Sequence, residues 1–274
     1  MKVTEQPSRY SNLEHTPTKL LLEEINREDQ SVPRVVAGCI PSIARLVDAI
    51  VERVRRGGRI FYAGSGTSGR LGVVDASEIP PTYGADDDLF NAVIAGGDGA
   101  IRKAVEGAED RTDAGWDDLK PFAPGPDDTL IGLSASGHTP YVIGALRRAG
   151  EEGLLTACIT CNPDTPAAEA AAIPIVAVVG PEFVTGSTRM KAGTAEKLIL
   201  NMISTSVMIR LGHVRGNRMV DMQLTNDKLV ERGTRFVMEE TGLKDEDAAR
   251  TLLLDSGSVR EAVQRYKTQK NVTE

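Results

Sequence analysis

"RIFYAGSGTSGRLGVVDASEIPPTYG", residues 59–84, combines three patterns in one short stretch. The apolar run at its start predicts a buried strand, and a loop of Gly, Ser and Thr follows that strand directly. The next residues carry a helical pattern, and we expect the helix to close at Glu78 because Pro80 and Pro81 cannot continue it. The stretch therefore predicts a strand–loop–helix unit of an α/β protein.

Strand and helix patterns alternate through the sequence that follows. Short apolar runs, typical of strands covered on both faces, occur at 89–97, 128–136, 154–161 and 173–180. Helical patterns lie between them at 100–110 and 140–153, and a long apolar helix is predicted over 187–212. We expect an α/β fold with a doubly wound parallel sheet flanked by helices.

The flanks of this sheet region differ from it in pattern. Residues 1–18 are polar and predict an arm. Residues 19–212 contain the predicted sheet and two helices that precede it. From 213 to 274 the pattern is charged and helical throughout, which predicts a small C-terminal helical subdomain.

Composition limits the classes of protein and partner. The 274 residues carry a net charge of -7, with 41% hydrophobic and 4% aromatic residues, and no basic stripe, so we expect no nucleic-acid partner. No apolar run reaches the roughly 18 residues of a membrane span, and the polar start does not resemble a signal peptide. Three cysteines and three scattered histidines suggest neither disulfides nor a metal site. We expect a cytoplasmic protein with no metal and no cofactor.

Two loops rich in small hydroxyl residues follow predicted strands, "GSGTSG" at 64–69 and "SASGHT" at 134–139. Open α/β sheets bind ligands at such strand ends, and the amides that begin the next helix favour an anion such as phosphate. Plain strand-to-helix turns are the alternative. A dinucleotide site is disfavoured, because the G-x-G-x-x-G pattern lacks an acidic residue about 20 positions further on.

Charged residues near these loops are candidates for chemistry. Glu78, at the expected carboxyl end of a helix, faces a dipole that favours its protonated form, as a general acid needs. A surface glutamate is the alternative. Glu106 and Glu109 are expected on adjacent faces of one helix, and the pattern alone does not choose between them. Arg189 and Lys191 begin the long helix and could reach an anion, or could be solvated.

Several blocks resemble the N-acetylmuramic acid 6-phosphate etherase family, built on the SIS phosphosugar-binding domain. They are "AGSGTSGRLGVVDASEIPPTYG", "AVIAGGDGAIRKAVEGAED", "SGHTPYVIGALRRA", "TCNPDTP" and "GPEFVTGSTRMKAGTAEKLILNMISTSVMIRLG". The resemblance runs from about residue 19 to at least 230. It implies cleavage of the D-lactyl ether of N-acetylmuramic acid 6-phosphate, without a metal, by elimination and then addition of water. It also implies a homodimer.

The resemblance assigns roles to residues that the patterns left open. It implies that Glu78 is the acid and that Glu109, rather than Glu106, is the base. It implies that the second loop holds the phosphate through Ser134, Ser136 and Thr139. It implies that the first loop holds sugar hydroxyls or helps to bind the phosphate, through Ser65, Thr67 and Ser68. His138 departs from the arginine expected there in many relatives. A phosphosugar isomerase and a non-catalytic sugar-phosphate sensor are the alternatives on the same scaffold.

Overall fold

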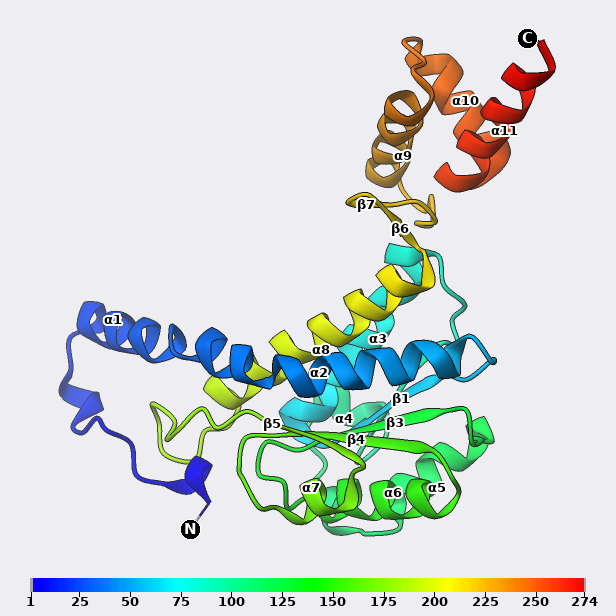
Figure 1. The fold of residues 1–274 in the computed structure, drawn as a ribbon. Coiled ribbons are helices and arrows are strands. Elements are labelled where there is room, and N and C mark those ends of the chain that lie inside the picture. The colour runs from blue at the N-terminus through cyan, green and yellow to red at the C-terminus, as the bar shows by residue number, and fades with distance from the viewer. Residues whose placement is uncertain (1, 274) are drawn as a thin grey trace. The chain divides into compact units, whose positions relative to one another are not determined.

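A computed structural model describes residues 2–273, with side chains up to residue 270. The chain forms two compact units (Figure 1). The first contains the residues up to Ser77 and Asp88–Val207, and the second contains Glu78–Asp87 and the chain from Met208 onwards. The division falls inside two helices, α3 (Gly66–Tyr83) and α8 (Lys191–Leu211).

The first unit is built on a five-stranded sheet. Its strands are β1 (Ile60–Gly64), β2 (Phe90–Ile94), β3 (Thr129–Leu133), β4 (Leu155–Thr160) and β5 (Ile173–Val176). They lie in the order β2-β1-β3-β4-β5, and every neighbouring pair is parallel. Every residue of β1, β3 and β4 is buried, as a sheet covered on both faces requires. The expected doubly wound parallel sheet is confirmed.

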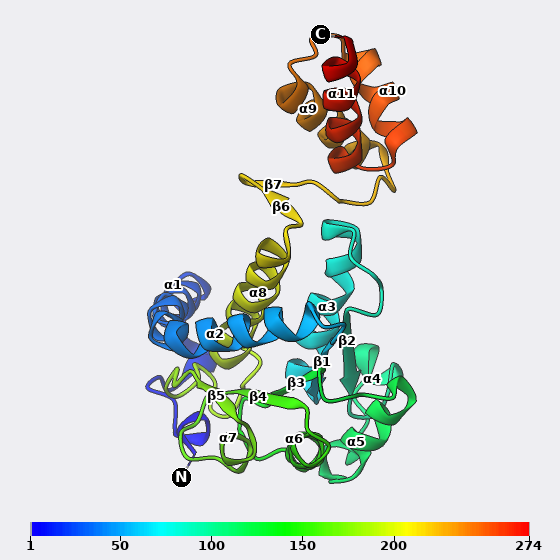
Figure 2. The ribbon, with the colours of Figure 1, turned by 45° about the vertical axis from the view of Figure 1, so that its right-hand side comes forward.

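Helices cover the two faces of this sheet. α5 (Ala114–Leu119), α6 (Pro140–Glu151) and α7 (Pro166–Ala170) lie on one face, and α2 (Val32–Val54) lies across the other, as Figures 1 and 2 show. On the α6 face, Phe61 and Leu130 pack with Tyr141 and Leu146 in one apolar cluster. α1 (Thr18–Asp29) precedes α2, and short 3-10 turns at Val3–Glu5, Leu13–His15 and Lys120–Phe122 complete the unit.

The strand order places the two hydroxyl-rich loops next to each other. From β1 the chain passes to β2 on one side of the sheet and then to β3 on the other, so the order reverses between β1 and β3. Ligands of open α/β sheets bind beyond the carboxyl ends of the strands at such a reversal. The loops that follow β1 and β3 are the "GSGTSG" and "SASGHT" segments.

The helix that follows β1 is longer than predicted. We expected α3 to close at Glu78, but it continues through Pro80 and Pro81 to Tyr83. Both prolines lie in the last turns, where few intrahelical bonds are lost, and Gly84 N donates to Pro80 O at 2.8 Å. One carbonyl of the helix end also has a partner in the same unit, since Gln223 N donates to Pro81 O at 3.3 Å. Glu78 is exposed and lies inside the helix.

The segment 100–110 is not the single helix that was predicted. α4 covers only Gly99–Arg102, and a separate 3-10 turn, η3, covers Ala108–Asp110. Between them Gly107 has φ of +71°, a conformation that favours glycine and breaks the helical path. Glu106 and Glu109 therefore lie on a turn instead of on adjacent faces of one helix.

The second unit carries most of the C-terminal helices. α9 (Asp227–Thr241), α10 (Glu246–Ser256) and α11 (Val259–Thr273) share an apolar cluster that includes Val237, Leu253 and Val263. The prediction that 213–274 are helical throughout is wrong at one place, because β6 (Val214–Arg215) and β7 (Arg218–Met219) form a short antiparallel ladder. No helix within residues 2–273 has the length and apolar character needed to cross a membrane.

Candidate functional site

The first loop connects β1 to α3 with little room for side chains. Gly64 lies against Gly69, and a Cβ on Gly64 would come within 2.7 Å of the Gly69 nitrogen. Small residues at both positions therefore bring the strand end and the first turn of the helix together. Between them, Ser65 Oγ donates to Glu109 Oε2 at 2.6 Å. The structure thus joins two of the predicted site residues, one from the loop and one from η3.

A cavity of about 190 Å³ opens beside this hydrogen bond. Its polar lining comes from Ser65, Arg70, Glu106 and Glu109, and most of its other lining residues are small or apolar. Both glutamates that the sequence left open thus border the cavity. Only Glu109 of the two accepts a hydrogen bond from the loop within the described part of the chain.

The second loop gathers hydroxyl groups at the end of β3. Ser134 Oγ lies 2.9 Å from Thr139 Oγ1 and 3.4 Å from Ser136 Oγ. Gly137 N donates to Ser134 Oγ at 3.0 Å, and its φ of +70° lets the loop turn where a Cβ would meet Thr165 at 2.4 Å. The three predicted phosphate ligands are therefore brought together. His138 Nδ1 lies 2.7 Å from Ser136 O, so its ring is held against its own loop.

Two other first-loop residues contact α8. Ser68 Oγ lies 2.8 and 2.9 Å from the carboxylate oxygens of Glu196, and Thr67 packs beside Gly193. Glu196 is fully buried, and this burial raises its pKa to about 8 even though the hydrogen bond from Ser68 lowers it. Sequence reasoning missed Glu196, for which the only signal was a single acid in a largely apolar helix.

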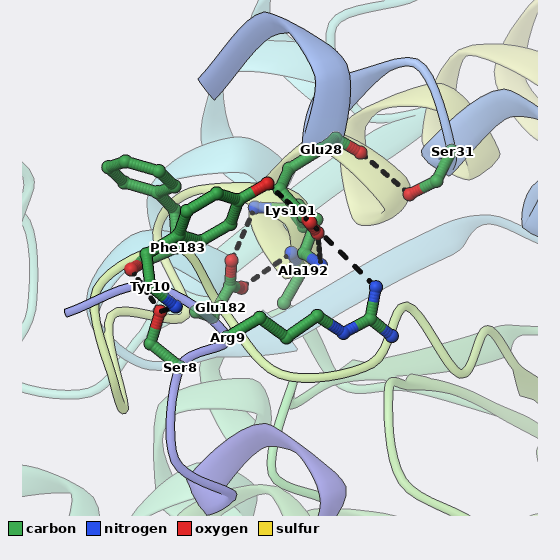
Figure 3. Close-up of polar contacts among 9 residues, drawn as sticks. All are labelled: Ser8, Arg9, Tyr10, Glu28, Ser31, Glu182, Phe183, Lys191 and Ala192. Atoms are coloured by element: carbon green, nitrogen blue, oxygen red, sulfur yellow. Dashed lines mark hydrogen bonds and ion pairs between the residues drawn. The ribbon is translucent and has the colours of Figure 1, made fainter. Parts of the chain in front are cut away.

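Lys191, predicted to reach an anion, is paired within the protein. Its side chain is 2% exposed, and Nζ lies 2.5 Å from Glu28 Oε2, as Figure 3 shows. Burial alone would raise the pKa of Glu28, but the hydrogen bond and charge of Lys191 outweigh it and lower that pKa. Tyr10 Oη also donates to Glu28, at 3.2 Å. A substrate contact by Lys191 stays a prediction and would require this pair to open.

The beginning of α8 is capped by a second buried glutamate. Glu182 accepts the backbone N–H groups of Lys191 and Ala192, each at 2.9 Å (Figure 3). A carboxylate at this end of a helix satisfies free donors and complements the helix dipole. Sequence reasoning missed both Glu28 and Glu182. Together they fix the start of the helix whose next turns contact the first loop.

Glu78 belongs to the second unit, whereas Ser65 and Glu109 belong to the first. Its assignment as the acid therefore remains a prediction from the sequence. Within residues 2–270, no group of three or more histidine, cysteine, aspartate or glutamate side chains is arranged to hold a metal ion.

Comparison with known proteins gives strong and extensive sequence matches. Residues 42–150 match the family model described as "Glucokinase regulatory protein N-terminal SIS domain". A protein named N-acetylmuramic acid 6-phosphate etherase from Bacteroides fragilis is 57% identical over 267 residues, covering 97% of this chain and 95% of the relative. One of the same name from Porphyromonas gingivalis is 58% identical over 266 residues, covering 97% of each chain.

Solved structures share the fold at low sequence identity. A phosphoheptose isomerase from Francisella tularensis is 18% identical with a TM-score of 0.52, covering 69% of this chain and 98% of that one. A phosphoheptose isomerase from Neisseria gonorrhoeae is 15% identical with a TM-score of 0.50, covering 69% of this chain and 96% of that one. These similarities support the fold of the sheet region alone.

Proposed function

Because this chain belongs to the N-acetylmuramic acid 6-phosphate etherase family, we propose that it cleaves the D-lactyl ether of N-acetylmuramic acid 6-phosphate. The products are N-acetylglucosamine 6-phosphate and D-lactate, which makes the chain a carbon–oxygen lyase that recycles cell-wall sugar. Identities of 57% and 58% over nearly the whole chain support this reaction. The structural observation that carries it is the hydrogen bond from Ser65 to Glu109 at the edge of the cavity.

The reaction we propose is an elimination followed by hydration. In the ring-opened sugar, the C1 aldehyde acidifies the C2 proton, which Glu109 removes as base. Glu78 donates a proton to the ether oxygen, so the C3–O bond breaks, D-lactate leaves and a C2=C3 double bond forms. Water then adds its hydroxyl at C3 and a proton returns to C2. The bond from Ser65 supports this role for Glu109, because it orients the carboxylate at the cavity.

The phosphate is assigned to the second loop. The hydroxyls of Ser134, Ser136 and Thr139 converge there, and α6 begins at the next residue, so the positive end of its dipole favours an anion at this loop. Ser65 and Thr67 are assigned to the sugar hydroxyls. Ser68 is assigned the same role. Its hydroxyl donates to Glu196 in this structure, so it must leave that carboxylate before it can bind the sugar.

The assembly and the domain roles are further parts of this proposal. We assign phosphosugar binding to residues 19–212, an accessory role to 213–274 and a wrapping role to the arm of 1–18. The arm contacts the 19–212 region within the first unit, since Ser8 Oγ donates to Phe183 O at 2.7 Å and Asn162 Nδ2 donates to Oγ1 of the buried Thr4 at 3.0 Å. We also propose that the chain is cytoplasmic and forms a homodimer. Analytical ultracentrifugation measures the oligomeric state.

Two glutamate variants test the chemistry separately. With N-acetylmuramic acid 6-phosphate in D₂O, Glu109→Gln should abolish both exchange of the C2 proton and release of D-lactate. Glu78→Gln should stop release while exchange continues, because the base remains. Glu106→Gln is the matched control, since Glu106 borders the same cavity without the bond from Ser65, and it should retain both activities.

The outcomes distinguish the competing functions. A phosphosugar isomerase would exchange protons but release no lactate in the unsubstituted protein. A sugar-phosphate sensor would bind the substrate with neither exchange nor release. If Glu106→Gln lost exchange and Glu109→Gln kept it, the assignment of the base would be wrong.

A further inference from the structure

The cavity beside Ser65 contains a group that the proposed reaction does not use, the guanidinium of Arg70. This residue lies in the second turn of α3 and lines the cavity together with Glu106 and Glu109. Among the described residues that line the cavity, Arg70 is the only cationic one. A cavity bordered by two carboxylates would repel an anionic substrate group, and Arg70 is the residue that can offset this repulsion.

The position of the guanidinium is fixed by two hydrogen bonds. Nε donates to Ile101 O at 2.8 Å, and Nη2 donates to Ala100 O at 2.7 Å. An arginine has five N–H donors, so three remain after these bonds. Within residues 2–270, the bonds to Ile101 and Ala100 are the hydrogen bonds of this guanidinium, and no carboxylate forms an ion pair with it. The group is therefore held in place with free donors and no neutralising partner.

We propose that Arg70 binds the carboxylate of the lactyl group and thereby makes the chain selective for ethers of 2-hydroxy acids. The inference rests on the proposed etherase function. A guanidinium binds a carboxylate through two parallel N–H donors and so fixes both its position and its plane. With its guanidinium already positioned, Arg70 loses little freedom when it binds.

The connectivity of the substrate brings its carboxylate into this cavity. The lactyl carboxyl carbon is four bonds from C2, through C3, the ether oxygen and the lactyl α-carbon. Glu109 must reach the proton on C2, so the carboxylate lies close to Glu109 whenever the base is in position. The cavity of about 190 Å³ is smaller than the roughly 300–1,000 Å³ typical of a whole ligand site. It therefore suits one end of the substrate, and the phosphate extends to the second loop.

A matched pair of substrates tests this selectivity. One is N-acetylmuramic acid 6-phosphate, and the other is its carboxamide, in which the lactyl carboxylate is a neutral amide of the same size. Both release N-acetylglucosamine 6-phosphate, so one assay measures kcat/KM for both. The variants are Arg70→Met and Arg70→Lys. The lysine retains the positive charge but lacks the two parallel N–H donors of the guanidinium. Arg102→Met, in the exposed last residue of α4, is the control.

Arg70→Met should lower kcat/KM for the carboxylate substrate about 10- to 100-fold, the cost of a lost charged hydrogen bond, and should change the carboxamide reaction little. Arg70→Lys should lose part of the same preference, and Arg102→Met none of it. An equal loss on both substrates would show that Arg70 holds the segment carrying Glu109 or binds the phosphate, and would overturn the proposal, as would no loss at all. If the unsubstituted chain formed product from neither substrate, the etherase function itself would fail.

Discussion

Glu196 allows the link between burial and pH to be tested with one substitution. Its carboxyl group is fully buried against Ser68, and burial raises its pKa from 4.5 to about 8. Because the pKa is raised in the folded state, folding favours the protonated form. The resulting stability is fully present below about pH 4.5, decreases as pH rises, and is lost once pH passes about 8.

The size of this effect follows from the shift. One pKa unit corresponds to about 1.4 kcal/mol, so between pH 5 and pH 8 the ionisable Glu196 should lower the free energy of unfolding by about 3–4 kcal/mol. Glu196→Gln has nearly the same shape and keeps the Ser68 contact, but it is neutral at every pH. The free energy of unfolding of this variant, minus that of the unsubstituted chain, should therefore rise by about 3–4 kcal/mol between pH 5 and pH 8.

Urea unfolding at pH 5 and pH 8, at one protein concentration, measures this difference. Subtracting the free energy of unfolding of the unsubstituted chain from that of the variant removes the contributions of other titrating groups. Glu169→Gln, at an exposed glutamate of the same unit, is the control and should show no pH-dependent gain. A gain for Glu196→Gln that is the same at both pH values would refute the reasoning.

Three further predictions concern residues of the first unit. Lys191→Met leaves Glu28 buried without its cation and should lower the free energy of unfolding by about 3–5 kcal/mol, measured in urea, and Glu28→Gln in the same chain should restore part of it. Ser65→Ala removes the bond to Glu109 and should lower kcat about tenfold, measured as D-lactate release, and KM should rise as well because Ser65 is also assigned to a sugar hydroxyl. Ser136→Ala should mainly raise KM, and a fall in kcat alone would contradict a binding role.

The sheet could be predicted from the sequence because its strands are buried on both faces. β1, β3 and β4 therefore consist of continuous apolar runs, and each ends at a loop of small hydroxyl residues or at a helix signal. The place of the candidate site followed from the same pattern, since the loops after β1 and β3 meet at the reversal of strand order. The assignment of Glu109 as the base came from the family resemblance and stays a prediction.

Local rules failed where tertiary contacts compensate for a local cost. The two prolines were expected to end α3, yet partners within the second unit satisfy the carbonyls of its last turn, and His213 Nδ1 lies 2.9 Å from Tyr83 O. The converse occurred at 100–110, where the helical apolar pattern was outweighed by Gly107 in a left-handed conformation.

Long-range polar pairs were beyond the reach of spacing arguments. Glu28 and Lys191 are 163 positions apart in the sequence, and nothing in either local segment indicates their contact. Lys191 was expected to face an anion because it begins a helix. Arg70, within the first strand–loop–helix unit, could be placed on the helix, but its two carbonyl partners depend on where α4 ends.

The most direct test of the etherase function is release of D-lactate by the purified chain. N-acetylmuramic acid 6-phosphate is the substrate, and the unphosphorylated sugar is the control. We expect release from the phosphorylated sugar alone, because the second loop is assigned to the phosphate. Saturable binding of the phosphorylated sugar without any release of lactate would contradict the etherase function and favour a sugar-phosphate sensor.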